Sequence, residues 1–317
     1  MTGEPKTLMD AIRYFSDADI SREYVAAIRW PEGVACPTCG SLEVRFLATR
    51  KLWECKSKHA RKQFSVKVGT IFEDSPVALD KWLAALWMLV NDKNGISSYE
   101  LAKSIGVMQS TGWFMLQRLR LALEDGTFNK MDGEVEADET FIGGKARNMH
   151  AGKRAQKITG TGGAGKAAVM GMLERHGPDG HSRVRTRVVP NTRRSSLGPV
   201  IAVNVETGAT VYTDGKASYD RLDEHFHDAV NHDAGEYVRE AVHTNGIENF
   251  WALLKRSLAG TYVSVEPFHL FRYLDEQVFR FNTRGMTDSA RFHAALKGVI
   301  GKRLTYAQLT ESGTTPA

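Results

Sequence analysis

Cysteine is scarce in this sequence, and no long hydrophobic segment is present. Three cysteines among 317 residues argue against a disulfide framework. The longest apolar run, residues 82–90, is about half as long as a helix that crosses a bilayer. The N-terminal residues contain no basic segment followed by an apolar core and a small-residue cleavage site. We therefore expect a cytoplasmic protein without a transmembrane helix.

The composition is that of a soluble globular protein. With 42% hydrophobic and 25% charged residues, a chain of 317 residues allows two or three structural units. The net charge of +5 is modest, but basic residues gather in residues 50–67 and 143–194, which contain few acidic residues. Two such stretches favour a polyanionic partner such as nucleic acid, although basic stretches are also typical of solvated surfaces.

The few cysteines have the spacing of a metal site. The four candidate ligands are Cys36, Cys39, Cys55 and His59. They form two close pairs of thiolate and imidazole ligands, which suits tetrahedral zinc. Short strands are expected beside the site at residues 42–48 and 63–69. The alternative is three free thiols and an unrelated histidine, and His59 is the least regular of the four in its spacing.

The pattern around these ligands predicts a small zinc ribbon. Neither a carboxylate nor an open coordination position accompanies the ligands, so we expect the zinc to be structural. The metal would fold a segment too short to form its own core, and the ribbon would present Arg61 and Lys62 to DNA or to a docking partner.

Residues 95–123 have the pattern of a helix-turn-helix. Ser97 and Glu100 can form a capping box, Gly106 ends the first helix, and Ser110 or Thr111 can begin a second. The residues expected to contact DNA from the second helix are Gln109, Ser110, Thr111, Gln117 and Arg118. A plain helical hairpin without a DNA-binding role is the alternative.

A glycine-rich stretch, residues 160–167, resembles a phosphate-binding loop only in part. Ala167 stands where that motif requires a hydroxyl residue, and the preceding segment is basic and polar instead of a buried strand. We therefore expect a flexible basic loop and no ATP binding.

Three acidic residues far apart in the sequence lie at informative places. Asp138 is near the middle of an expected strand, Asp214 ends another, and Glu248 lies in the first turn of an amphipathic helix. Each has an ordinary interpretation as well, since Asp is frequent in turns and a first-turn Glu complements the helix dipole.

The order of the expected elements brings the three acidic residues together. Strands are expected at residues 133–142, 167–174 and 183–189, followed by a helix at 193–204, a strand ending at Asp214 and the helix that carries Glu248. This β-β-β-α-β-α order is that of a ribonuclease H-like mixed α/β sheet with flanking helices. In that topology the first and fourth strands are neighbours, so Asp138 and Asp214 would lie side by side under Glu248.

Three neighbouring carboxylates imply divalent cations, because they would otherwise repel one another and protonate. Mg²⁺ or Mn²⁺ is expected, with two ions supporting an in-line displacement at a phosphodiester. Lys255 and Arg256 on the same helix are expected to hold the DNA backbone.

Several motifs in this order resemble one known family. The segments are CPTCG, KQFSVKVGTIFEDSPVALDKW, ADETFIGGK, YTDGKASY, HTNGIENFWALLKRSLAGTY and RYLDEQVFRFNTR, within residues 20–290. Together they resemble the bacterial insertion-sequence transposases that join an N-terminal zinc ribbon to a DDE catalytic domain. One departure is that Cys55 is followed by His59, where family members usually carry a second Cys-x-x-Cys pair.

The resemblance implies a DNA transposase with Asp138, Asp214 and Glu248 as its acidic triad. It would bind terminal inverted repeats, cleave DNA at the element ends and join the 3′ ends to target DNA as a homodimer or larger assembly. Asn245, Glu139 and Glu236 lie close to the motif positions and are candidates to assist or substitute as ligands. Two other hypotheses are a domesticated DNA-binding regulator and a ribonuclease H-like nuclease.

The expected organisation has five segments. They are N-terminal helices at residues 1–30, the zinc ribbon at 31–75, the helix-turn-helix region at 76–128, the catalytic domain with C-terminal helices at 129–300, and a tail at 301–317. The aromatic C-terminal helices are expected to support the catalytic sheet, and residues 311–317 to be disordered. His225, His227 and His232 are expected to be surface or hydrogen-bonded residues.

Overall fold

The computed structural model divides the chain into two compact units, which are considered separately. One contains residues 1–124 and 285–317, and the other contains residues 125–284. The structure describes residues 4–124, 126, 129–144, 150–152, 165–177, 179–219, 222, 224–230, 238–239, 242–263 and 265–310. Within these ranges no helix is both long and apolar enough to cross a membrane.

The first unit begins with two capped helices and a small sheet. Helices α1 (Leu8–Phe15) and α2 (Ala18–Arg29) are capped by Thr7 and Asp17. Strands β1 (Val44–Leu47), β2 (Leu52–Cys55) and β3 (Gln63–Phe64) form an antiparallel sheet in that order. The second expected strand is therefore much shorter than residues 63–69, because the chain turns at residues 66–69.

Helices complete the first unit. They are α3 (Leu79–Asn91), α4 (Ser98–Ile105), α5 (Gln109–Ala122), α10 (Asp288–Lys297) and α11 (Tyr306–Thr310). The expected capping box between Ser97 and Glu100 is present, and Gly106 ends α4 with a φ of 63° that favours glycine. Helix α10 packs on α3, with the Phe292 ring 5.1 Å from that of Trp87. It therefore stabilises this unit.

The second unit is built on a five-stranded mixed sheet. Its strands are β4 (Glu134–Ile142), β5 (Ala167–Glu174), β6 (Arg183–Val189), β7 (Thr210–Thr213) and β8 (Phe226–Ala229). Their order is β6-β5-β4-β7-β8, with β4 antiparallel to β5 and parallel to β7. This confirms the ribonuclease H-like fold and the adjacency of the first and fourth strands. Strand β8 was not expected from the sequence.

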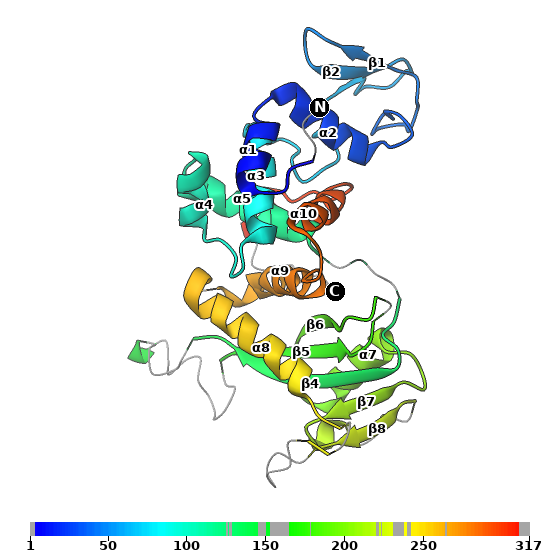
Figure 1. Cartoon of the computed structure of the whole chain (residues 1–317), viewed down its shortest axis with the longest axis vertical. Coiled ribbons are helices and arrows are strands. Elements are labelled where there is room, and N and C mark those ends of the chain that lie inside the picture. Colours follow the sequence, from blue (N-terminus) through cyan, green and yellow to red (C-terminus); the bar gives the residue numbers. More distant parts are fainter. Residues whose placement is uncertain are drawn as a thin grey trace. The chain divides into compact units, whose positions relative to one another are not determined.

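Helices cover both faces of this sheet. Helix α7 (Arg194–Asn204) packs on one face, where Leu197 and Ile201 join the core with Val135 and Ala137. Helices α8 (Asn245–Ser257) and α9 (Leu270–Asn282) share the core of the other face (Figure 1). Since side chains alternate along a strand, Glu136 and Asp138 point toward α8. Short 3₁₀ turns at Ala217–Tyr219 and Pro267–His269 and a π turn at Leu258–Tyr262 complete the described elements.

Candidate active site and metal centre

The three cysteines and one histidine gather beside the small sheet of the first unit. The ligand atoms of Cys36, Cys39, Cys55 and His59 all lie within 4.8 Å of one another. Cys36 Sγ is 3.5 Å from His59 Nε2, and Cys39 Sγ is 3.6 Å from Cys55 Sγ. Ligands about 2.3 Å from a tetrahedral zinc ion would be roughly 3.7 Å apart. The spacing therefore fits zinc.

The surroundings favour the thiolate at Cys36 and Cys55, whereas at Cys39 a backbone hydrogen bond from Ser41 acts to lower the pKa but burial and the neighbouring thiols outweigh it and raise the pKa. Burial raises the pKa of Cys36, but hydrogen bonds from the backbone amides of Thr38 and Cys39 outweigh it and lower the pKa. For Cys55 burial again raises the pKa, and hydrogen bonds led by that of His59 lower it overall. Because thiolates are the form that binds metal, both shifts suit a cation in the cluster.

Asp138 lies on β4, and Asp214 directly follows the neighbouring parallel strand β7. Glu136 on β4 is paired with Tyr212 on β7, and two residues further along each strand come Asp138 and Asp214. The register thus brings together two residues that are 76 positions apart in the sequence. Asp214 follows the last residue of β7, at the end of the strand.

Asp138 lies in a partly buried and electrostatically mixed environment. Burial raises its pKa to about 6, with Lys216 acting to lower the pKa and Asp214 acting to raise it. The indole Nε1 of Trp251 on α8 donates to Asp138 Oδ2 at 3.1 Å. A carboxylate in this setting gains from a cation, since burial and a neighbouring carboxylate both disfavour its charge.

Asp214 is held by a lysine. Lys216 Nζ is 3.1 Å from Asp214 Oδ2 and 2.7 Å from Glu139 Oε2. Burial acts to lower the pKa of Lys216, but the two carboxylates outweigh it and raise the pKa. Asp214 Oδ1 is buried and has no hydrogen-bond partner among the described residues.

Glu139 and Glu248 have different surroundings. Glu139 lies on the α7 side of β4, where it is buried and accepts a hydrogen bond from the Tyr219 hydroxyl. Glu248 is exposed in the first turn of α8, one turn before Trp251, and accepts from Thr244 Oγ1 at 2.9 Å. Asn245 is the first residue of α8, and Glu236 lies outside the described residues.

Asp138, Asp214 and Glu248 lie around the face of the sheet that α8 covers, but their carboxylate oxygens do not form one compact cluster. In the described part of the chain, the Cys–His cluster is the only group of three or more acidic, cysteine or histidine residues with all ligand atoms within 4.8 Å. Asp138 and Asp214 are brought together by the sheet, whereas Glu248 depends on the placement of α8.

Comparison with known proteins connects these features. A family model for the ISXO2-like transposase domain matches residues 130–282, and one for a transposase zinc-ribbon domain matches residues 16–61. A Halobacterium salinarum protein named "Uncharacterized protein in transposable element ISH50" is 31% identical over 263 residues, which cover 79% of this chain and 86% of that protein. The chain belongs to the ISXO2-like insertion-sequence transposases.

A second relative of the transposase is shorter. A Haemophilus influenzae protein named "Uncharacterized transposase-like protein" is 38% identical over 102 residues, which cover 32% of this chain and 81% of that protein. The zinc-ribbon match and the Cys₃His cluster together support a structural zinc in the transposase.

The residues expected to contact DNA differ in exposure. Arg61, Lys62, Gln109, Ser110, Lys255 and Arg256 are exposed, and Thr111 is partly exposed. Gln117 and Arg118 are 0% and 4% exposed. Arg118 donates to the backbone oxygens of Ile71, Glu73 and Leu304 at 2.8–2.9 Å. The prediction that Gln117 and Arg118 contact DNA is therefore corrected: both side chains lie inside the first unit, and Arg118 ties three segments of it together.

Residues that position α8 were missed at the sequence level. Gly171 on β5 is paired with Asp138, and a Cβ there would lie 2.5 Å from the Trp251 ring and 2.8 Å from Ile247 Cδ1. Glycine therefore lets α8 approach the sheet beside Asp138. A glycine inside an apolar strand pattern is a known signal of close approach, and this signal was available. Glu136 and Arg175, described below, had no comparable signal.

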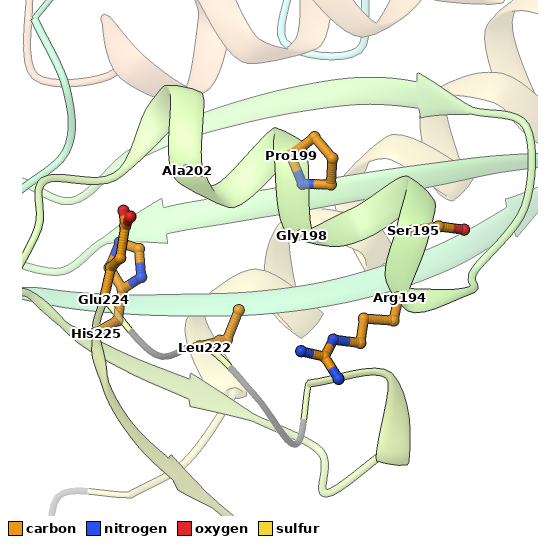
Figure 2. A pocket seen from close by; sticks show the side chains of 8 residues that line it. All are labelled: Arg194, Ser195, Gly198, Pro199, Ala202, Leu222, Glu224 and His225. Carbon is orange, nitrogen blue, oxygen red and sulfur yellow. The ribbon is translucent and has the colours of Figure 1, made fainter.

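A separate hollow of about 630 Å³ lies against α7. Figure 2 shows Arg194 at one end of it and Glu224 and His225 at the other. None of the three acidic residues lines it. His227 lies 2.9 Å from Thr213 Oγ1, as expected for a hydrogen-bonded histidine. His232, residues 160–164 of the glycine-rich stretch and the tail at 311–317 lie outside the described residues.

Proposed function

We propose that the protein is a Mg²⁺-dependent DDE transposase that cleaves DNA at the ends of its insertion sequence and joins the 3′ ends to target DNA. The observation that carries the proposal is the placement of Asp138 on β4 and of Asp214 at the end of the neighbouring parallel strand β7, with Glu248 on the helix that covers this face of the sheet. Membership of a transposase family supports the use of these residues in DNA strand cleavage.

The residues present fit magnesium. The donors are carboxylate oxygens, which Mg²⁺ prefers, and Asp214 Oδ1 is buried without a hydrogen-bond partner among the described residues. Asp138, Asp214 and Glu248 would hold the metal, and Mn²⁺ could take its place. Two bound ions would supply charge stabilisation for the attacking and leaving oxygens of a phosphodiester.

The protein's own side chains prepare this face for DNA. Lys216 balances the charge of Asp214 and Glu139, and the Trp251 indole fixes the orientation of Asp138. Lys255 and Arg256, exposed on α8, would attract the phosphate backbone. In the first step water attacks the phosphodiester at the element end and a 3′-hydroxyl leaves; in the second, that hydroxyl attacks a target phosphodiester and displaces another 3′-hydroxyl.

Recognition of the element ends is assigned to the first unit. Arg61 and Lys62 on the zinc ribbon, and Gln109, Ser110 and Thr111 at the start of α5, would contact the terminal inverted repeats. Their exposure supports this role, as does the α4–α5 pair, in which Gly112 lies close to Ser98 and Ala102. We expect a homodimer or larger assembly on DNA, because the two ends of the element must be held and processed together. We also expect the protein to act in the cytoplasm.

The test is strand cleavage of supercoiled DNA that carries the repeats flanking the gene. Wild-type protein with Mg²⁺ is expected to nick at the repeat ends, while Asp214→Asn and Glu248→Ala abolish nicking and retain repeat binding. Binding without nicking by the wild type would indicate a DNA-binding regulator. Cleavage of RNA–DNA hybrids in preference to repeat ends would indicate a ribonuclease H-like nuclease.

A further inference from the structure

A buried carboxylate of the sheet reaches the N-terminus of α8. Glu136 lies on β4, two residues before Asp138 and on the same face, and is 1% exposed. Its Oε2 accepts a hydrogen bond from the backbone amide of Ile247 at 2.9 Å. Ile247 is the third residue of α8, and the first four amides of a helix have no partner within it. Glu136 therefore caps α8 from the neighbouring strand, where Thr244 makes no side-chain cap.

The residue before Ile247 is adapted to this contact. A Cβ on Gly246 would lie 2.8 Å from Glu136 Oε2 and 3.1 Å from Leu173 Cδ1. Gly246 is inside a helix and does not have a positive φ, so the backbone does not require glycine there. The glycine instead leaves room for the carboxylate against the first turn.

An arginine holds the other oxygen of Glu136. Arg175 Nε donates to Glu136 Oε1 at 2.8 Å, and Arg175 Nη2 donates to the backbone oxygen of His243 at 2.8 Å. The Arg175 side chain is 11% exposed. Glu136 and Arg175 thus fix the chain at two points, one just before α8 and one in its first turn.

The energetics favour orientation over stability as the role of this pair. A buried ion pair contributes little net stability, because desolvation offsets its attraction, and apolar replacements are often equally stable. The pair instead orients the chain that leads to Glu248, because Arg175 donates a hydrogen bond to the His243 backbone oxygen and Glu136 accepts one from the Ile247 amide.

We propose that Glu136, supported by Arg175, is a positioning residue for Glu248. By holding the first turn of α8 in place, Glu136 sets the position from which the Glu248 carboxylate would bind the metal. The inference therefore rests on the proposed function. Glu134 is the matched control. It lies on the same face of β4 and shares Arg175, at 3.5 Å, but its other hydrogen bond comes from the Tyr212 hydroxyl on β7 at 2.7 Å.

The first test follows the helix directly and needs neither metal nor DNA. Hydrogen exchange of the first-turn amides of α8 is measured in wild type, Glu136→Gln and Glu134→Gln. We expect exchange at Ile247 to be at least about tenfold faster in Glu136→Gln and unchanged in Glu134→Gln, because one hydrogen bond is worth about that factor. Equal exchange in all three proteins would overturn the inference even if the wild type cleaves DNA.

The second test measures Mn²⁺ affinity of the DNA-free protein in a double-mutant cycle with Glu248→Gln. Glu136→Gln is expected to weaken Mn²⁺ binding by roughly 10- to 100-fold in the presence of Glu248, and to have no further effect once Glu248 is replaced. A lower melting temperature with unchanged Mn²⁺ affinity, or an effect that persists in Glu248→Gln, would show a merely structural role.

Gly246→Ala provides a second route if Glu136→Gln does not fold. Alanine is the better helix former, so weaker Mn²⁺ binding would have to come from the close contacts of its Cβ, with Glu136 Oε2 at 2.8 Å nearer than Leu173 Cδ1 at 3.1 Å. We expect a loss similar to that of Glu136→Gln, and unchanged affinity would contradict the inference. Absence of Mn²⁺ binding or cleavage by the wild type would instead contradict the proposed function, while the exchange experiment would still decide whether Glu136 anchors α8.

Discussion

The zinc ribbon and the acidic face of the larger sheet assemble their ligands in opposite ways. The ribbon takes four ligands from residues 36–59, and their ligand atoms lie within 4.8 Å of one another. The acidic face would take its ligands from positions 138, 214 and 248, which the sheet register and the packing of α8 place on the same side of the sheet. A local site such as the zinc ribbon folds together with its metal. A distributed site such as the acidic face, whose residues are far apart in the sequence, needs the fold to form first.

The largest expected effect is that of removing zinc. Metal binding contributes about 10–16 kcal/mol in small zinc domains, so Cys36→Ser or a strong chelator is expected to unfold the ribbon. The second unit, which has its own core, is expected to stay folded. Hydrogen exchange resolved by segment checks this, with loss of protection in β1–β3 and retention in β4–β5. Loss of protection in both would contradict the independence of the acidic face from the ribbon.

Replacing a proposed ligand of the acidic face is expected to reduce activity without reducing stability, which is the reverse of the effect of removing zinc. Asp138→Asn should reduce cleavage by at least about 100-fold, since a metal site supplies several kcal/mol of charge stabilisation. Its melting temperature without metal should not fall, because burial and Asp214 disfavour the charged form of Asp138. Calorimetry of the metal-free variant checks this, and a clear drop in melting temperature would show that the carboxylate has a structural role.

Gly171→Ala should disturb the distributed site without touching a ligand. The added methyl would meet Trp251 and Ile247 at less than 3 Å, and such overpacking costs about 1–3 kcal/mol. Gly198→Ala on α7 is the control: the added atom meets nothing within 4 Å outside its chain neighbours, and the better helix propensity of alanine is opposed by its position before Pro199, so stability should change by less than about 1 kcal/mol. Urea unfolding curves of the two variants test the difference, and equal stabilities would mean that α8 can shift at no cost.

Features formed by residues close in the sequence could be predicted more completely than features formed by residues that only the fold brings together. The zinc cluster could be predicted because two short spacings already imply its geometry. The order of strands and helices predicted the sheet topology, in which the strand that carries Asp138 lies beside the strand that leads to Asp214. The Glu136–Arg175 anchor of α8 could not be predicted, since its contacts join β4, the end of β5 and α8, and depend on side-chain directions that no local pattern encodes.

A final contrast separates an exposed basic residue from a buried one. The helix-turn-helix interpretation predicted that Arg118 contacts DNA, but its guanidinium donates to three backbone oxygens inside the unit. Arg118→Gln should therefore lower stability, because carbonyls bonded to a charged donor lose about 1.5–3 kcal/mol per bond. Lys62 is exposed, so Lys62→Gln should leave stability unchanged and reduce the salt slope of DNA binding by about one. Binding titrations across salt concentrations, with a melting curve for each variant, measure both quantities. A reduced salt slope for Arg118→Gln at full stability would return that residue to the DNA-binding surface.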